Sequence, residues 1–261
     1  MSRPKKKILL FLVEGYTDIN VLSSPIISFV ENNSLSDQEF IVEFCSYRDE
    51  NASGGDVTSR NGVNPDNIES VISKNVIKPF FSRNQHYYLK DVYKVIMITD
   101  LDGAYISDEN IIKCEEPEEK LIYNSTSIIT NNPSSTIERN ERKRLNIDKL
   151  VELDEIKLSQ NGGKNSKNIP FSIYYFSSNL EDCLYGIKNV TSAEKVKLSD
   201  NFMRQIDTFE AFYNYLSERK VFSEKTDYKD SWEEIRDYGE KSLMPGTNIH
   251  IMFDRLNREL F

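Results

Sequence analysis

Near the start of the chain, residues 8–13 form an unbroken run of apolar side chains that stops at Glu14. An apolar run without polar alternation is typical of a strand buried on both faces, as in a parallel sheet that helices cover on both sides. A second, mostly apolar run over residues 93–99 passes directly into Asp100 and Asp102. The two runs therefore predict buried parallel strands of an α/β fold, each ending on acidic residues.

The segments between and after these runs complete the order of an α/β domain. Apolar periodicity and turn residues predict the remaining elements: a helix after Gly15 that Thr17 caps and that kinks or restarts at Pro25, a strand over 39–45, a polar loop over 49–64, a helix over 67–81 and a strand over 169–176. The order strand, helix, strand, helix, strand indicates a parallel sheet flanked by helices. Ligands of such sheets gather at the carboxyl ends of the strands, where the acidic residues fall.

The length of 261 residues fits one catalytic core with additions. We expect a core over residues 1–190 with an insertion at about 104–168, followed by a mainly helical accessory region over 191–261. The finer elements expected in these parts are helices over 135–144 and 147–158, a flexible link over 161–168 and an amphipathic stretch over 202–216. The insertion is therefore predicted to be helical.

The charge balance limits how the chain can meet a partner. With 33 Lys and Arg against 42 Asp and Glu, the net charge is −9, so bulk attraction to nucleic acid is disfavoured and metal ions or a local basic patch must assist. Cys45, Cys114 and Cys183 are odd in number and widely spaced, which argues against a disulfide framework or zinc site and favours a reducing cytoplasm. No apolar run approaches the roughly 18 residues of a membrane span, and the one after Lys7 is too short for a signal peptide.

Acidic residues at strand ends are suited to bind a divalent metal. Mg²⁺ is held by a few carboxylates and keeps several waters, and Asp100 and Asp102 can reach one ion, with Gly103 allowing a tight backbone path. Glu14 repeats this arrangement at the end of the first strand. Asp18 lies at the start of the following helix, where the helix dipole favours a carboxylate. The alternative for these acids is a solvated strand end without a bound ion.

Two motifs of the sequence resemble those of the Toprim domain: VEGYTD over residues 13–18 and ITDLDG over residues 98–103. This domain is shared by topoisomerases, bacterial primases, small RNA-maturation nucleases and the nucleases of overcoming-lysogenization-defect type. The resemblance implies a Toprim-like Rossmannoid parallel sheet over roughly residues 7–190. It also implies site residues for Mg²⁺ or Mn²⁺: Glu14 as a metal ligand or acid–base group, Asp100 and Asp102 as metal ligands, and Asp18 as a further ligand or a supporting group.

The second motif departs from the form that it has in topoisomerases. The topoisomerase form carries a further acid shortly after the pair, whereas Gly103 is followed here by Ala104, Tyr105 and Ile106. The chain is also too short to carry the DNA-gate domains of a topoisomerase. The resemblance therefore points to the nuclease branch, with metal-dependent hydrolysis of phosphodiester bonds.

A third acidic pair, Glu181 and Asp182, follows the strand predicted over residues 169–176. It resembles the later acidic element of the nuclease branch and would complete a second metal site. The alternative is that Asn179 caps the next helix and the two acids favour its first turn.

Basic residues give weaker indications. Residues 54–60 could present backbone N–H groups and Arg60 to a phosphate, but they lack the spacing of a Walker loop and favour an ordinary polar loop. Two further groups suit either contact with a substrate or a solvated position: Arg139, Arg142, Lys143 and Arg144 on a predicted helix, and Lys164 and Lys167 before the last predicted strand.

These expectations describe a cytoplasmic Toprim-type nuclease that acts on RNA, such as tRNA, or on DNA. Stand-alone Toprim proteins of this size resemble toxic effectors of bacterial anti-phage defence, which implies an ATPase sensor as a partner protein. A homo-oligomer is one possible state of the chain, and no membrane partner is expected. Two alternatives are a non-catalytic Toprim-fold subunit that regulates or binds a partner, and another metal-dependent phosphotransfer enzyme.

Overall fold

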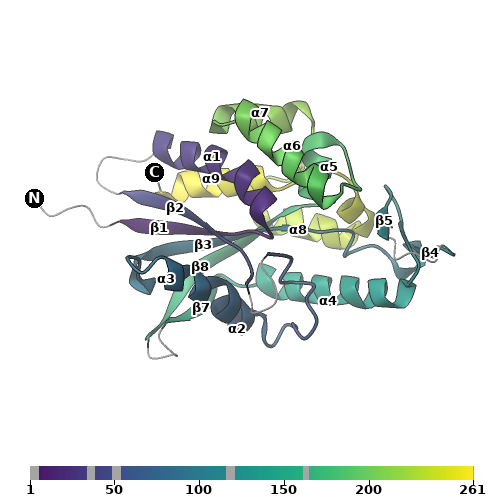
Figure 1. Ribbon diagram of the computed structural model, residues 1–261, viewed down its shortest axis with the longest axis horizontal. Helices are drawn as coiled ribbons and strands as arrows, with labels where there is room; N and C mark the ends of the chain where they lie inside the picture. Colours follow the sequence, from purple (N-terminus) through teal and green to yellow (C-terminus); the bar gives the residue numbers. More distant parts are fainter. Residues whose placement is uncertain (1–5, 34–38, 49–53, 116–120, 161–164, 261) are drawn as a thin grey trace, which may run out of the picture.

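The structure is a computed structural model that describes residues 6–33, 39–48, 54–115, 121–160 and 165–260 (Figure 1). Its main sheet has the strand order β2-β1-β3-β8-β7, in which the first four strands run parallel and β7 is antiparallel to β8. The strands are β1 (Lys7–Leu12), β2 (Phe40–Cys45), β3 (Val92–Asp100), β7 (Glu155–Gln160) and β8 (Asn165–Phe176). The prediction of an α/β fold with a mainly parallel sheet flanked by helices is therefore confirmed.

Helices cover both faces of this sheet (Figure 1). One face packs against α1 (Tyr16–Asn33), α5 (Leu180–Tyr185), α6 (Ser192–Gln205), α7 (Phe209–Glu218) and α9 (Ile249–Leu260). The other face packs against α2 (Ile68–Ile72), α3 (Lys78–Arg83), α4 (Pro133–Val151) and α8 (Tyr228–Asp237). Short 3₁₀ turns complete the chain: η2 (Leu89–Asp91), η3 (Asp108–Asn110) and η4 (Gly239–Leu243).

Strand β1 shows why its sequence is continuously apolar. Ile8 and Leu10 belong to the core shared with α2 and α4, Leu9 and Phe11 belong to the core shared with α1 and α9, and all four are 0% exposed. Each such side chain contributes about 1.5–3 kcal/mol by leaving water. Because parallel strands end at the same edge of the sheet, the residues that follow β1, β3 and β8 are brought together there.

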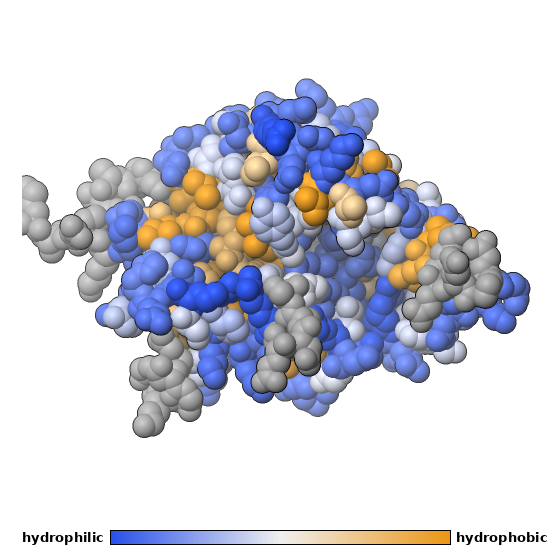
Figure 2. Space-filling model, in the orientation of Figure 1, coloured by the Kyte–Doolittle hydropathy of each residue, from blue (hydrophilic) through white to orange (hydrophobic). Residues whose placement is uncertain are grey.

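Figure 2 shows hydrophobic residues on the surface over the edge strand β2, on a face that is otherwise largely hydrophilic. Phe40 and Val42 of this strand are half-buried. Cys45, Cys114 and Cys183 are free thiols. In the described part of the chain, no helix is both long enough and apolar enough to cross a membrane.

The first helix differs in detail from its prediction. α1 begins at Tyr16 and continues through Pro25 as one helix, so Pro25 does not restart it and Thr17 lies inside its first turn rather than at its cap. The Asp18 carboxylate instead accepts the backbone N–H of Gly15 at 2.8 Å, which satisfies a donor at the start of the helix.

The helices expected over 67–81 and 135–144 are confirmed with changes in their boundaries, the second of them inside α4. The helix expected over 67–81 runs through α2, a π-helical segment η1 (Ser73–Ile77) and α3. The C-terminal region is mainly helical, as predicted, but residues 202–216 are not one helix. They are divided between α6, which ends at Gln205, and α7, which begins at Phe209. The Thr208 hydroxyl accepts the N–H of Ala211 and so caps the start of α7.

Residues 104–168 are not the helical insertion that the sequence predicts. The helix expected over 147–158 is wrong, because α4 ends at Val151 and Glu155–Gln160 forms β7 in the main sheet. A second sheet of order β4-β6-β5 also lies here, made of β4 (Ile111–Lys113), β5 (Leu121–Tyr123) and β6 (Ile128–Thr130). Of the predicted flexible link, residues 161–164 lie outside the described residues, and residues 165–168 begin β8.

Candidate functional site

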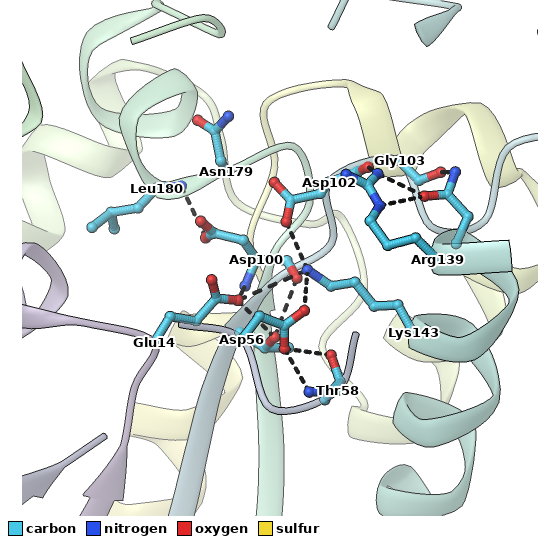
Figure 3. Close-up of polar contacts among 12 residues, drawn as sticks. Glu14, Asp56, Thr58, Asp100, Asp102, Gly103, Arg139, Lys143, Asn179 and Leu180 are labelled. Atoms are coloured by element: carbon cyan, nitrogen blue, oxygen red, sulfur yellow. Dashed lines mark hydrogen bonds and ion pairs between the residues drawn. The ribbon is translucent and has the colours of Figure 1, made fainter. Parts of the chain in front are cut away.

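The acidic residues predicted at the ends of β1 and β3 lie side by side (Figure 3). Glu14 follows β1, and its Oε1 accepts hydrogen bonds from the backbone N–H of Asp100 at 3.1 Å and from the Thr99 hydroxyl at 3.2 Å. Asp100 is the last residue of β3, and its Oδ1 accepts the N–H of Leu180 at 3.0 Å. The ends of β1 and β3 and the start of α5 therefore fix these two carboxyl groups against each other.

The turn after β3 holds Asp102 in an uncommon backbone conformation. Asp102 has a φ of 49°, and its N–H donates to the Ser178 carbonyl at 2.8 Å. Gly103 follows with a φ of 71°, and a Cβ at this position would lie 2.6 Å from Cδ2 of Leu243. Residues other than glycine seldom adopt a positive φ, and those that do gather at functional sites. The neighbouring segments thus hold the backbone of Asp102 where its carboxylate joins the cluster.

The ammonium group of Lys143, from the middle of α4, lies among the acidic residues (Figure 3). Its Nζ is 2.7 Å from Asp102 Oδ2, 3.0 Å from Asp56 Oδ2 and 3.8 Å from Glu14 Oε1. The Lys143 side chain is only 1% exposed, so the sequence expectation of a nucleic-acid contact or a solvated helix face is wrong for this residue. We call Glu14, Asp56, Asp100, Asp102 and Lys143 the carboxylate cluster.

Asp56 is a member of the carboxylate cluster that the sequence did not indicate. Its Oδ1 accepts the N–H and the hydroxyl of Thr58, at 2.7 and 2.6 Å. The N–H of the preceding Gly55 donates to the Glu14 carbonyl at 2.7 Å, which ties this loop to the end of β1. The stretch over residues 54–60 is therefore part of the site, and the interpretation of it as an ordinary polar loop is corrected.

Burial and like charges raise the pKa values of several acids here. Burial raises the pKa of Glu14 to about 8 although the Lys143 ammonium opposes the shift. Burial and then the charge of Glu14 hold the pKa of Asp100 well above its usual range. Burial also raises the pKa of Asp18 to about 6. The charged forms of these three acids are therefore destabilised at the end of the sheet.

Lys143 and Asp56 form an ion pair in which each charge favours the other. Burial alone would lower the pKa of Lys143, but Asp102, Asp56 and Glu14 outweigh it and hold this pKa well above its usual range. Burial would likewise raise the pKa of Asp56, but the Lys143 ammonium and the hydrogen bonds of Thr58 bring it below its usual value. The acids left without full compensation are Glu14 and Asp100.

The third predicted acidic pair lies at the start of α5. Asn179 caps this helix by accepting the N–H of Asp182 at 2.8 Å, so the capping interpretation is confirmed. Asp182 Oδ2 lies 2.9 Å from Lys188 Nζ, and Glu181 Oε2 lies 3.0 Å from Lys195 Nζ. Each acid of this pair therefore has a lysine of its own.

Glu181 and Asp182 differ in their electrostatic contact with the carboxylate cluster. The charge of Glu181 contributes to the raised pKa values of Asp18 and Asp100, so it lies within electrostatic reach of both. The ion-pair partner of Asp182 is Lys188, which follows the end of α5 in the chain. Glu181 is thus the member of the pair that could extend the site, and a second metal site stays a prediction.

The donor set fits a divalent metal ion by its chemistry. Among the described residues, no three acidic, histidine or cysteine side chains surround a common point, and the Lys143 ammonium separates Asp102 from Glu14. The available donors are nevertheless carboxylate oxygens, which Mg²⁺ and Mn²⁺ prefer. The raised pKa of Glu14 shows that burial destabilises its charged form, and a bound cation would stabilise that form. Glu14, Asp100 and Asp102 are therefore the residues that would hold such an ion.

The remaining basic residues of interest divide between the two ends of β3. Arg139 Nη2 donates to the Asp102 carbonyl at 3.2 Å, beside the carboxylate cluster. Lys167 Nζ donates to the Val92 carbonyl at the opposite, amino end of β3, so it is not placed to neutralise charge at the site. Lys164 lies outside the described residues.

Comparison with known proteins supplies no relative for this chain. No family model, no curated protein and no solved structure matches it. A function for the chain is therefore argued from the geometry of the carboxylate cluster and from the Toprim resemblance of its two motifs.

Proposed function

We propose that this chain is a metal-dependent nuclease that hydrolyses phosphodiester bonds of RNA or DNA. The observation that carries the proposal is the meeting of Glu14, Asp100 and Asp102 at the ends of two adjacent parallel strands, with negative charge that Lys143 does not fully neutralise. Two motifs that resemble those of the Toprim domain contain the same three acids. The carboxyl edge of a parallel sheet is also the usual place for a ligand.

Four residues of the carboxylate cluster have a role in this proposal. Glu14, Asp100 and Asp102 would hold Mg²⁺ or Mn²⁺, which when bound polarises a phosphodiester and makes a water more acidic. Glu14 Oε1 is fixed by the N–H of Asp100 and the Thr99 hydroxyl, so Oε2 is left to meet a cation or to accept a proton from water. Lys143 keeps the carboxylates together in the absence of substrate.

The proposal is tested by incubating the purified chain with mixed tRNA, single-stranded RNA and plasmid DNA. We expect cleavage with Mg²⁺ or Mn²⁺ that EDTA stops and that Glu14→Gln or Asp100→Asn abolishes. Glu152→Gln, an exposed acid at the end of α4, is the matched control and should keep full activity. Cleavage that persists in Glu14→Gln and Asp100→Asn would overturn the site assignment, and no cleavage of any polynucleotide would overturn the function.

A non-catalytic Toprim-fold subunit is the second candidate, and one observation favours it. The Lys143 ammonium already lies between the carboxylates, as it would in a cluster that only stabilises the fold. The same assay separates the two, because a structural cluster binds no substrate and cuts none. Another phosphotransfer enzyme would instead turn over small phosphoesters and leave polynucleotides intact.

The Toprim resemblance extends the proposal to a biological setting. By this analogy the chain is a toxic effector of anti-phage defence that acts beside an ATPase sensor, with tRNA as one candidate target. Expression of the wild-type chain together with such a sensor should then arrest bacterial growth during infection, whereas Asp100→Asn should not. Equal growth of the two strains would contradict this setting without bearing on cleavage in vitro.

A further inference from the structure

A cavity of about 590 Å³ lies beside the carboxylate cluster, between the loop that follows Asp56 and the first half of α4. We propose that it binds a phosphate group of the nucleic-acid backbone next to the bond that is cut, so that the site accepts polynucleotides rather than small phosphoesters. This inference rests on the proposed function for its biological meaning. The volume of the cavity is within the range of about 300–1,000 Å³ that ligand pockets occupy.

The charge of the cavity is opposite to that of the chain as a whole. Arg60, Arg139 and Arg142 line it, and none of the described residues that line it is Asp or Glu. The chain meanwhile carries 42 acidic against 33 basic residues. Local positive charge of this kind is what an acidic protein needs in order to hold a polyanion, because arginine pairs with phosphate oxygens through two N–H groups at once.

The walls of the cavity are continuous with the carboxylate cluster. Arg139 Nη2 donates to the carbonyl of Asp102 at 3.2 Å, and Arg142 Nε donates to the carbonyl of Ser59 at 2.8 Å. Ser59 belongs to the same loop as Asp56, whose carboxylate pairs with Lys143 at 3.0 Å. A nucleic-acid strand with one phosphate at the carboxylate cluster would therefore place a neighbouring phosphate at this cavity.

Arg142 is the arginine best placed to donate to a ligand. Its Nε is used by Ser59, while its two terminal nitrogens have no partner among the residues that the structure describes. The start of α4 adds to the positive potential, since Asn132 caps this helix of 19 residues and Ser135, three positions on, also lines the cavity. Because the N–H of Ser135 donates to the Asn132 side chain, the helix start contributes its dipole, which favours an anion.

The test measures binding of a fluorescent single-stranded oligonucleotide by anisotropy at several salt concentrations. It uses the Asp100→Asn chain, so that binding is read without cleavage. Arg142→Gln removes the cationic donor, and Ser135→Asp places a negative charge at the cavity where an acid in the first helical turn favours the helix. Their controls are Arg144→Gln and Ser134→Asp, neighbours on the same helix that do not line the cavity.

We expect Arg142→Gln and Ser135→Asp to weaken oligonucleotide binding about tenfold, the size of effect for one charged hydrogen-bond partner. For Arg142→Gln the slope of log affinity against log salt should also fall by about 0.7, the contribution of one phosphate contact in a single strand. Both controls should bind nearly as the parent chain does.

Two results would overturn the inference. One is equal affinity of Ser135→Asp and Ser134→Asp, together with an unchanged salt slope in Arg142→Gln. The other is an equal loss in the lining variants and their controls, which would indicate diffuse attraction to α4 rather than a cavity. Because binding is measured apart from cleavage, either result leaves the nuclease proposal standing, and an inactive wild-type chain would not alter this test.

Discussion

At the ends of β1 and β3 three carboxylates share one ammonium, whereas on α5 each carboxylate has an ammonium of its own. Glu14, Asp56 and Asp102 all lie within 3.8 Å of Lys143 Nζ, and Asp100 stands beside them without a lysine within ion-pair distance in the described chain. Burial first, and then the charges of neighbouring acids, raise the pKa values of Glu14 and Asp100. A buried excess of negative charge is costly, and a bound cation is the ordinary way to remove that cost.

The pair on α5 shows what acids look like when their charges are balanced. Asp182 is paired with Lys188 and Glu181 with Lys195. Asn179 caps the start of the helix that carries both acids. The carboxylate cluster has four acids and one lysine, whereas the pair on α5 has two acids and two lysines. The number of cations available to each acid is what separates a candidate metal site from a helix start that is already neutral.

The largest effect should come from removing the shared lysine. Lys143→Met leaves Glu14, Asp56 and Asp102, which are partly buried, without a cation, and breaking a buried pair in this way costs at most about 3–5 kcal/mol. Urea unfolding in EDTA should show this loss, and Mg²⁺ should restore a large part of it, because the metal would replace the missing charge. A loss of stability that Mg²⁺ does not relieve would mean that the cluster holds lysine but no metal.

Next in size is the loss of catalysis at Asp100. Asp100→Asn should lower the rate of RNA or DNA cleavage by at least about 100-fold, as expected for a group that acts at the reacting atoms. Asp182→Asn, the same change in the balanced pair, should leave most of the activity. Comparable losses in the two variants would remove the distinction between the regions and would favour a site that includes both.

Stability in EDTA should depend on pH through Glu14, whose pKa is raised from 4.5 to about 8. An acid whose folded-state pKa is raised stabilises the fold fully below its unfolded pKa, and this contribution is lost as the pH rises through the folded value. Between about pH 6 and about pH 8 we expect a loss of about 2 kcal/mol in unfolding free energy. Glu14→Gln should flatten this dependence, and an equal slope in the variant would assign it to other groups.

The smallest effect should come from removing both charges of one ion pair on α5 at the same time. In the double variant Asp182→Asn with Lys188→Met both charges disappear together, so the unfolding free energy should change by only about 1 kcal/mol. Addition of Mg²⁺ should stabilise this variant as much as it stabilises the wild-type chain. A weakened response to Mg²⁺ would instead bring Asp182 into the metal site.

The strands of the main sheet that could be predicted are those buried on both faces. Continuous apolar runs identify β1 and β3, because no helix exposed to water would lack polar positions. β7 was missed because the helix expected over 147–158 was extended across it, although Ile156 and Leu158 alternate with polar residues at the spacing of a strand. Pairing with β8, which the local sequence does not specify, makes this segment a strand.

The site could be predicted only where it lies at strand ends. Glu14, Asp100 and Asp102 follow buried strands, and the topology of a parallel sheet brings them to one edge. Lys143 was missed although a signal exists, since it lies four residues before Ile147 and so shares the buried face of α4. Asp56 comes from a loop without periodicity, and its contact with Lys143 depends on how that loop folds back to β1.

Crystals of the chain soaked in Mn²⁺ and measured for anomalous scattering would test the central claim most directly. The account predicts an anomalous peak at the ends of β1 and β3, against the carboxylates of Glu14 and Asp100, with the Lys143 ammonium displaced from its position between the acids. Crystals of Asp100→Asn soaked in the same way should lose that peak. A peak on α5 beside Asp182, or no peak at the carboxylate cluster, would contradict the account.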